Sequence, residues 1–453
     1  MNTSLLRIAR PSVLAALLLA FGAFRAEAMI DGIPGPAFDL VAKADHITTG
    51  DGRSVYFWGY ADGSATGMGR AQYPGPTFIV NQGDMVSVTL RNRLPVPVSL
   101  VFPGQRVTAA GGSGGLLTQE VPAYTGAFPD PSVTYTFTAA KPGTYLYHSG
   151  TRPELQVEMG LVGAIIVRPA GFDPMAPTAY GSPGSAYTHE TLFVLSEMDP
   201  RVHELVETQG PAALAATDYL SDYFPNYWFM NGRNAPDTMA PAMAAWLPTQ
   251  PYDCMPRMHP GERLLMRVVV AGRDLHPFHH HGNHARVIAR DGRPLETLPG
   301  ALDLSHEVFT IQSVPGETVD AIFQWTGEKL GWDMYGTGPD HEHSCNGISV
   351  NAPGTVASPG FDPVTGEYCP DHGKPLPVTL PQQQDLTFGG FWSGSPFLGT
   401  LSSLPPGQGG LNPNGGFTYM WHSHAEKELT NYNIFPGGMM TMLILEPPGA
   451  PIP

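Results

Sequence analysis

Five of the sixteen histidines in this 453-residue chain lie in one short segment, RDLHPFHHHGNH at residues 273–284. Side chains two residues apart share one face of an extended strand, so His279 and His281 should project together. A second pair with the same spacing, His422 and His424, lies in MWHSH near the C-terminus. Neutral imidazole is a ligand for copper and zinc. Two such pairs on neighbouring strands therefore predict one shared metal site.

The N-terminus has the features of an export signal. Arg7 and Arg10 precede an apolar run at residues 13–24, and an AEA cleavage motif follows at residues 26–28. The apolar run is too short to span a membrane as a mature helix, and no later stretch is long and apolar enough to do so. We therefore expect residues 1–28 to be a signal peptide, and the mature protein to be periplasmic or secreted with no membrane span.

The composition is that of an acidic β protein rich in turns. The chain has 24 Lys and Arg against 40 Asp and Glu, a formal net charge of −16, and the predicted loss of the signal makes it more negative. This balance argues against nucleic acid as a partner. The 53 glycines and 47 prolines separate short runs rich in Val, Thr, Tyr and Phe, a pattern typical of an all-β fold.

The distribution of strand-like runs predicts two domains. The first β domain is expected at residues 37–168, followed by a linker rich in Pro, Gly, Ala and Ser at residues 169–187. The second β domain is expected at residues 188–447. It contains a long Pro/Gly-rich insertion at about residues 336–416, a length that is unusual for a loop inside a compact domain.

The two predicted domains look like copies of one unit. Alignment on their glycines places residues 101–104 over residues 279–282, and TYLYHSG at residues 144–150 over TYMWHSH at residues 418–424. The second copy carries four histidines at these positions, whereas the first carries one, His148. The repeat is therefore structural, and metal chemistry belongs mainly to the second copy.

Taken together, these segments resemble the multicopper oxidase family, which is built from cupredoxin domains. The resemblance covers most of the predicted mature chain and rests on YPGPTFIVNQGDMVSVTLRNRL, GTYLYHSGTRPELQVEMGLVGAIIV, YWFMNGR, HPGERLLMRVVVAGRDLHPFHHHG, MWHSH and PGGMMTML. It implies two cupredoxin-type Greek-key β-sandwich domains with copper as the cofactor. It also implies a homo-oligomer, often a trimer in two-domain relatives, with the copper cluster formed between domains of different subunits.

The resemblance also implies roles for individual histidines. In the family, a three-copper cluster reduces dioxygen, and a separate blue copper feeds it electrons. By position, His276 matches a blue-copper ligand and His279 matches the ligand of the single copper in the cluster. The ligands of the copper pair are matched by His148, His281, His422 and His424.

The chain departs from the family pattern at several of these positions. Ser423 stands where the family has the blue-copper cysteine, and Glu428 where it has the second blue-copper histidine. A serine hydroxyl cannot supply the soft thiolate of such a centre. Val101, Pro103 and Gly150 replace three cluster histidines, so five of the eight expected remain. We predict no blue-copper site and a smaller centre of one or two copper ions.

Several interpretations remain open at this stage. The chain is either an exported copper-binding oxidoreductase, supplied with electrons by a small-molecule substrate or a donor protein, or a metal-free cupredoxin scaffold that binds partners at the cell envelope or surface. Metal sequestration without catalysis would use the same histidines. Without its cysteine partner His276 is expected to be structural, and His148 is either a ligand or a core histidine.

The three cysteines add one further expectation. In an exported protein Cys345 and Cys369 are expected to form a disulfide within the insertion, which leaves Cys254 as a free thiol. The alternative is a zinc-like ligand set composed of His341, His343, Cys345, Cys369 and His372.

Overall fold

The computed structural model describes residues 30–65, 68–326 and 417–446, together with residue 452 and short strand segments between residues 350 and 396. The predicted signal peptide and most of the predicted insertion lie outside these residues. Of the possible zinc ligands of the insertion, the backbone of Cys369 is described, in a short strand, whereas the other ligands and the predicted disulfide lie outside these residues. Cys254 is a buried free thiol, and its Sγ lies 3.1 Å from the carbonyl oxygen of Met230. No helix in the described part of the chain has the length and apolar character needed to cross a membrane.

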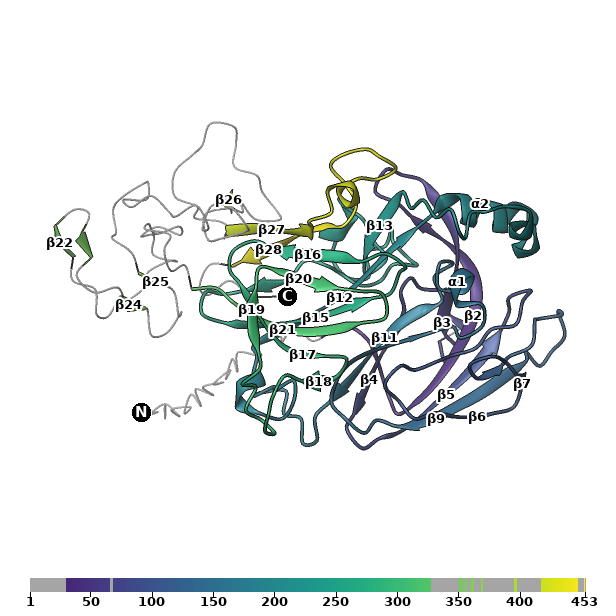
Figure 1. Ribbon diagram of the computed structural model, residues 1–453, viewed down its shortest axis with the longest axis horizontal. Coiled ribbons are helices and arrows are strands. Elements are labelled where there is room, and N and C mark those ends of the chain that lie inside the picture. Colours follow the sequence, from purple (N-terminus) through teal and green to yellow (C-terminus); the bar gives the residue numbers. More distant parts are fainter. Residues whose placement is uncertain are drawn as a thin grey trace, which may run out of the picture.

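The first part of the chain forms a sandwich of two sheets (Figure 1). The five-stranded sheet has the order β3 (Ser54–Asp62), β2 (Ala37–Thr48), β5 (Met85–Asn92), β9 (Ser132–Thr138) and β6 (Thr108–Ala110). The four-stranded sheet has the order β1 (Ile33–Pro34), β4 (Gly75–Asn81), β11 (Val162–Arg168) and β10 (Gly143–His148). A hairpin of β7 (Ser113–Gly114) and β8 (Gln119–Glu120) and a short helix, α1 (Pro153–Gln156), complete this domain.

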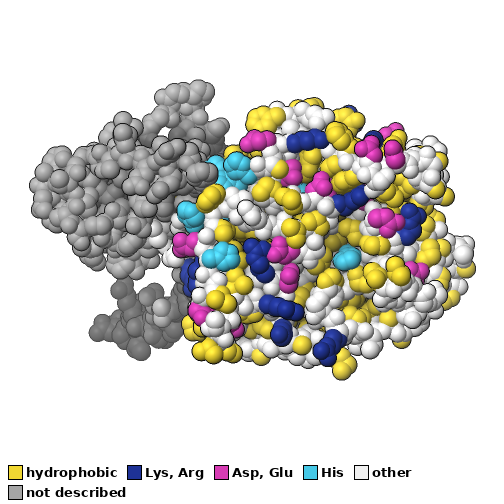
Figure 2. Space-filling model, viewed as in Figure 1, with side chains coloured by type: hydrophobic (Ala, Val, Ile, Leu, Met, Phe, Trp, Pro, Cys, Tyr) yellow, Lys and Arg dark blue, Asp and Glu magenta, His cyan; other side chains and the backbone are white. Residues whose placement is uncertain are grey.

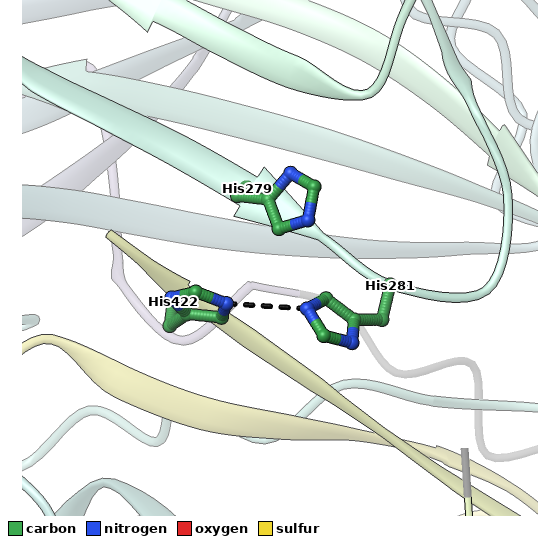
Figure 3. A group of neighbouring side chains, drawn as sticks. All are labelled: His279, His281 and His422. Carbon is green, nitrogen blue, oxygen red and sulfur yellow. Dashed lines mark hydrogen bonds between the residues drawn. The ribbon is translucent and has the colours of Figure 1, made fainter. Parts of the chain in front are cut away.

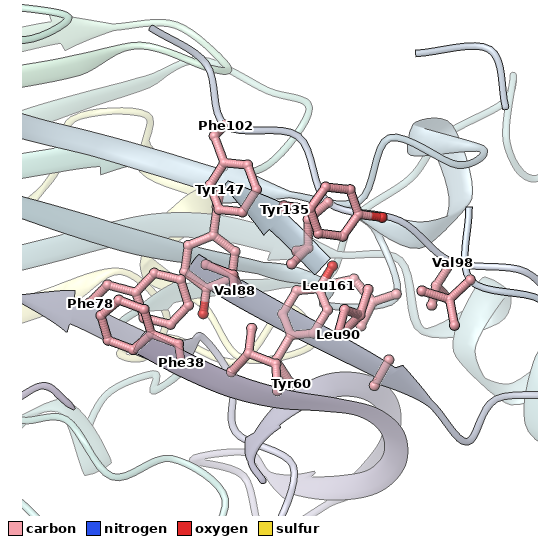
Figure 4. Close-up of a cluster of buried hydrophobic side chains, with 14 of the residues drawn as sticks. Phe38, Tyr60, Phe78, Val88, Leu90, Val98, Phe102, Tyr135, Tyr147 and Leu161 are labelled. Atoms are coloured by element: carbon pink, nitrogen blue, oxygen red, sulfur yellow. The ribbon is translucent and has the colours of Figure 1, made fainter. Parts of the chain in front are cut away.

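The core of this domain follows from the alternation of its strands. Strands β5 and β9 read MVSVTLRN and SVTYTFT, and every second residue is buried. These side chains meet an aromatic group in which the rings of Phe78 and Tyr147 stack with centroids 4.6 Å apart (Figure 4). Burial of this apolar area is the main term that stabilises the sandwich.

The second part of the chain forms a larger sandwich. One sheet has the order β13 (Tyr227–Met230), β12 (His189–Met198), β15 (Arg263–Val270), β21 (Thr318–Gln324), β17 (Ala285–Arg290) and β18 (Arg293–Pro294), and β19 (His306–Val308) also pairs with β17. The other has the order β14 (Arg257–Met258), β28 (Met440–Leu445), β27 (Phe417–Ser423), β16 (His276–His280) and β20 (Thr310–Ser313), with β26 (Ser395–Pro396) paired to β27. Two further short pairs join β22 (Val350–Ala352) to β23 (Thr355–Val356) and β24 (Gly360–Phe361) to β25 (Tyr368–Cys369).

The two sandwiches pack against each other through an apolar seam. Strand β11 is buried at every position because Ile165 and Val167 face the core of the first sandwich, whereas Ala164 and Ile166 face the second. Strand β12 is buried on both faces in the same way. This double burial explains the continuous apolar runs AIIV in β11 and LFVL in β12, which do not alternate with polar residues.

A buried group of charges crosses this seam. Arg168 of β11 and Arg267 of β15 both donate to Glu190 of β12, at 2.7 Å and 2.9 Å from its Oε2. Burial alone would raise the pKa of Glu190, but the two guanidinium groups hold it below its ordinary value. Asp320 of β21 lies 3.7 Å from Arg267 and accepts a 2.6 Å hydrogen bond from Thr144 of β10. The seam is therefore polar in its middle and fully paired in charge.

Residues 169–187 connect the sandwiches and are packed rather than free. They contain a single turn of 3-10 helix, η2 (Pro183–Ser185), and Ala179 and Tyr187 join a small apolar cluster with Leu265 of β15. The predicted linker thus covers one end of the second sandwich.

Helix α2 (Pro200–Gln209) follows β12 and ties the second part of the chain to the first. The Asp199 side chain caps its first turn by accepting from the backbone N–H of Arg201 at 3.0 Å, and Pro200 occupies the position that needs no donor. Val202 and Val206 are buried in the core of the first sandwich. Three short 3-10 helices complete the described elements: η3 (Pro211–Ala216), η4 (Asp237–Met239) and η6 (Glu426–Leu429).

Candidate metal centre

The two histidine pairs of the sequence meet on one face of the six-stranded sheet. Strands β16 and β27 are antiparallel, and their register places His279 directly opposite His422. Phe278 and Trp421 point into the core between the sheets, so the alternating positions His279 and His422 lie on the outer face. His281 follows the end of β16, where its backbone N–H donates to the carbonyl oxygen of residue 420 at 3.2 Å.

The ring nitrogens of these residues lie close to one another. Ligand atoms of His279, His281 and His422 all lie within 4.8 Å of one another, and the Nε2 atoms of His281 and His422 are 3.2 Å apart (Figure 3). Two nitrogens bound tetrahedrally to one ion, at the ~2.0–2.1 Å of a zinc–imidazole bond, are about 3.3 Å apart. The spacing therefore suits a shared metal ion.

Hydrogen bonds at the far side of two rings fix which nitrogen faces the centre. Nδ1 of His422 lies 2.7 Å from the carbonyl oxygen of Ser423. A carbonyl only accepts, so this Nδ1 carries the proton and Nε2 keeps its lone pair in the neutral ring. Nδ1 of His279 lies 2.9 Å from the hydroxyl of Thr310, which leaves Nε2 for the centre.

Thr310 was not singled out from the sequence. No sequence motif marks Thr310 as part of the site. Its place becomes evident in the structure, because β20 pairs with β16 and sets Thr310 opposite His279. Two polar groups thus orient two of the three rings.

Burial keeps these rings neutral. It lowers the pKa of His279 to about 3, and repulsion from His281 and His422 acts in the same direction. Burial also lowers the pKa of His422, against the hydrogen bond to the Ser423 carbonyl. The uncharged imidazole that results at neutral pH is the form that binds a metal.

His424 borders this group from the solvent. Its side chain is exposed, and its ring centroid lies 4.9 Å from that of His279 and 5.6 Å from that of His422. Figure 2 shows histidine side chains reaching the surface over the second sandwich. We call His279, His281, His422 and His424 the histidine cluster.

His280 faces away from the cluster, as the alternation along the strand predicts. It is fully buried, and its ring lies 5.9 Å from the rings of both Phe323 and Trp421. Its Nδ1 lies 3.0 Å from the carbonyl oxygen of Asn283. This histidine therefore belongs to the core of the second sandwich.

His276 does not join the cluster either, although its position matches a ligand in the resemblance. Its Nε2 lies 2.9 Å from Oε2 of Glu197, and its Nδ1 lies 2.9 Å from Oε2 of Glu428. Carboxylates only accept, so both nitrogens donate and the ring is a cation. Burial would lower the pKa of His276, but the two carboxylates raise it to about 10. Both ring nitrogens are thus engaged by carboxylates, and the role of His276 stays a prediction.

Glu197 is the second residue that the sequence did not single out. It lies on β12, 79 residues before His276, and also accepts the backbone N–H groups of Arg273 and Asp274. Ser423 is fully buried, and its hydroxyl accepts from the backbone N–H of Ala425 at 3.2 Å. A histidine held by two carboxylates therefore stands where the resemblance implied a blue copper.

His148 lies in the first sandwich, and the groups of ligand atoms that converge among the described residues do not include it. Its Nδ1 lies 2.9 Å from the carbonyl oxygen of Ser149, an arrangement equivalent to that of His422 and Ser423. Burial lowers its pKa. The neutral ring therefore also presents a lone pair at Nε2, although at a different place in the molecule.

Comparisons with known proteins agree with this fold. Residues 60–171 match the family model described as multicopper oxidase. Over 147 residues the chain is 34% identical to a probable nitrite reductase–hydroxylamine oxidoreductase fusion protein of Kuenenia stuttgartiensis, a match that covers 31% of this chain and 16% of that protein. Over 259 residues it is 26% identical to the copper-containing nitrite reductase of Alcaligenes faecalis, and this match covers 55% of this chain and 60% of the relative. The chain thus spans less than two thirds of either relative.

Among solved structures, the blue copper oxidase from Nitrosomonas europaea aligns with a TM-score of 0.51 at 19% identity, covering 90% of this chain and 85% of the other. This likeness defines the class: an all-β protein with the cupredoxin-type fold of copper oxidases. The match of residues 60–171 to the family model and the likeness of the fold agree with the resemblance to the multicopper oxidase family that the sequence motifs carry. The chain's relatives are copper oxidases and copper nitrite reductases.

Proposed function

We propose that this chain is an exported, copper-binding oxidoreductase of the multicopper oxidase type that has no blue-copper site. One or two copper ions would be held by the histidine cluster. The observation that carries this proposal is the convergence of three imidazoles, with ligand nitrogens within 4.8 Å of one another. Imidazole suits several metals, and copper is favoured because it is named for the Alcaligenes faecalis relative and the Nitrosomonas europaea structure.

Bound copper would supply one-electron chemistry, and the protein would supply the environment. Thr310 and the carbonyl of Ser423 orient His279 and His422 so that their Nε2 atoms face the centre. Because the pKa of His279 is about 3, protons do not compete with the ion for this ring at neutral or mildly acidic pH.

Electrons would enter this centre directly from a small-molecule substrate or from a donor protein. A blue-copper relay needs two imidazoles and a thiolate. Here His276 is protonated at both nitrogens, and Ser423 offers a hydroxyl. The expected consequence is a copper protein that lacks the intense colour of a copper–thiolate bond.

We further propose that the chain forms a homo-oligomer, a trimer by resemblance, in which His148 of one copy approaches the cluster of another. The cluster lies on the outer face of its sheet, away from the core of its own sandwich. In both His148 and His422, Nδ1 is hydrogen-bonded to the carbonyl oxygen of the next residue, which leaves Nε2 for a metal. Light scattering of the purified protein, which measures the mass in solution, tests this assembly, and a monomer would contradict it.

The decisive experiment measures copper in protein purified from copper-replete medium. We expect one to two copper ions per chain, a colourless or weakly coloured protein, and loss of the metal in His279→Ala and His422→Ala. The matched control is His46→Ala, an exposed histidine of the first sandwich. Assays with dioxygen and with nitrite as electron acceptors follow the two kinds of relative, and sequencing of the mature N-terminus tests export.

Two outcomes would contradict the proposal. Folded wild-type protein with well under one copper per chain would remove the cofactor. Alanine variants that lose stability but neither metal nor activity would favour the metal-free scaffold.

A further inference from the structure

A second group of ligand-type side chains lies on the other sheet of the second sandwich. His189 is the first residue of β12, and His259 and Glu262 lie in the turn between β14 and β15. Ligand atoms of these three residues all lie within 4.8 Å of one another. None of them belongs to the histidine cluster, which lies on β16, β27 and the residues that follow these strands.

The local sequence explains how two of the three residues meet. HPGE at residues 259–262 has proline and glycine at the central positions of a type II turn, the glycine with a positive φ of 81°. The backbone N–H of Glu262 lies 3.3 Å from the carbonyl oxygen of His259 and closes the turn. The parallel pairing of β12 with β15, which sets His189 opposite Leu264, brings in the third residue.

Both histidines approach the same carboxylate oxygen of Glu262. Oε2 of Glu262 lies 2.7 Å from Nε2 of His189 and 3.2 Å from Nδ1 of His259, and it accepts the backbone N–H of His259 at 2.7 Å. Oε1 of Glu262 makes no hydrogen bond to any residue that the structure describes. The side chains of His189, His259 and Glu262 are 8%, 24% and 18% exposed, so the group is sheltered but open to ions from solution.

We propose that His189, His259 and Glu262 form a second cation site, which binds a zinc-like divalent ion independently of the histidine cluster. Two imidazoles and one carboxylate hold zinc in enzymes that keep a fourth position open, whereas calcium and magnesium prefer sets made only of oxygens. The ion would replace the contacts between the two imidazoles and the carboxylate. Oε1 of Glu262, which has no hydrogen-bond partner among the described residues, would offer the ion a second ligand atom.

A cavity lies beside one of the three residues. His189 lines this cavity together with Asp253 and Arg257, and its volume is about 650 Å³.

The test uses the full chain with the histidine cluster removed by His279→Ala and His422→Ala, so that failure of the copper proposal does not affect it. Zinc ions are titrated into this metal-free protein by calorimetry. We expect one zinc ion per chain, with affinity at least tenfold weaker after a further Glu262→Gln or His189→Gln change. His46→Gln is the matched control, because His46 pairs with Glu207 alone at 2.8 Å and has no second histidine.

The competing account is an ion pair that only fastens β12 to the turn. Absence of zinc binding in the parent protein would overturn the proposal. The same holds for variants that bind zinc unchanged while their melting temperature falls. Should the variants misfold, cobalt ions added to the parent protein decide the matter. Visible absorption at one equivalent of cobalt supports the site, and a spectrum without it refutes the site.

Discussion

The two sandwiches share one backbone arrangement and differ in the side chains placed on it. In the first, the backbone of Val101 pairs with that of His148 in an isolated antiparallel bridge. In the second, His279 pairs with His422 at the equivalent place. The backbone therefore supplies a site for facing side chains in both halves, and only one half fills it with facing imidazoles.

The likeness extends to the glycines that follow these segments. Gly104 and Gly282 have positive φ values of 84° and 105°. A Cβ at either position would lie 3.1 Å from a tyrosine ring, that of Tyr145 or that of Tyr419. Equivalent turns thus pack on equivalent rings. Metal chemistry in this fold is a matter of a few substitutions on a turn and strand pair that both halves possess.

The largest expected effect separates the two halves directly. His422→Ala should weaken copper binding by about a hundredfold or more, about 3 kcal/mol, because it removes a ring from the convergent group. His148→Ala, the equivalent change in the first sandwich, should leave the affinity of an isolated chain unchanged. Competition titration with a copper chelator measures both. Equal losses in a trimer would mean that the first half supplies a ligand across subunits, and no loss from His422→Ala would show that the cluster is not the centre.

The second-largest expected effect concerns the buried charges at the seam between the two sandwiches. Glu190→Gln leaves the buried guanidinium groups of Arg168 and Arg267 without their shared carboxylate, which should cost about 3–5 kcal/mol of unfolding free energy. Glu207→Gln, at an exposed pair with His46, should cost about 0.5 kcal/mol or less. Urea unfolding of both variants gives the comparison. Similar costs would mean that the charges at the seam are dispensable.

A third prediction uses pH to distinguish the halves. The pKa of His276 is raised to about 10 when the protein is folded. Its contribution to stability is therefore complete below the unfolded value of about 6.5, and it is lost as the pH rises through about 10, by a few kcal/mol. The aligned residue in the first sandwich is Val98, which does not titrate. Unfolding free energies measured between pH 6.5 and 10 should fall in the wild type and change less in His276→Gln, and parallel curves would contradict the charged assignment.

The smallest effect tests the shared backbone itself. Gly104→Ala and Gly282→Ala should each cost about 1–2 kcal/mol, because both residues adopt a conformation that favours glycine. Thermal unfolding of the two variants measures the costs. A cost at one position alone would mean that the two turns are not equivalent.

Local pattern predicted much of this structure. The His-x-His spacing was enough to place His279 on one face of its strand and His422 on one face of another, because side-chain direction follows a period of two. That these two strands are neighbours was an expectation, which the pairing of β16 with β27 confirms. The all-β fold followed from glycine, proline and short apolar runs. The metal role of these histidines stays a prediction.

Long-range partners could not be predicted in the same way. Nothing near His276 in the sequence indicates that Glu197, on a strand of the other sheet, will meet its ring. Strands β11 and β12 show no alternation because both faces are buried, so the seam between the halves was not evident. At the second cation site, the turn that joins His259 to Glu262 can be recognised in HPGE, whereas the contribution of His189 depends on parallel pairing.

The protonated ring of His276 has a consequence for any attempt to engineer a blue-copper site into this chain. Replacing Ser423 with cysteine would bring a thiol to a pocket whose histidine already donates through both nitrogens. A two-histidine thiolate site would also need Glu428 replaced by histidine and Glu197 withdrawn from the ring. Glu428→His alone would still leave the imidazolium of His276 paired with Glu197. A cysteine at residue 423 would therefore meet a ring that Glu197 keeps protonated, and no single substitution would build a thiolate metal site here.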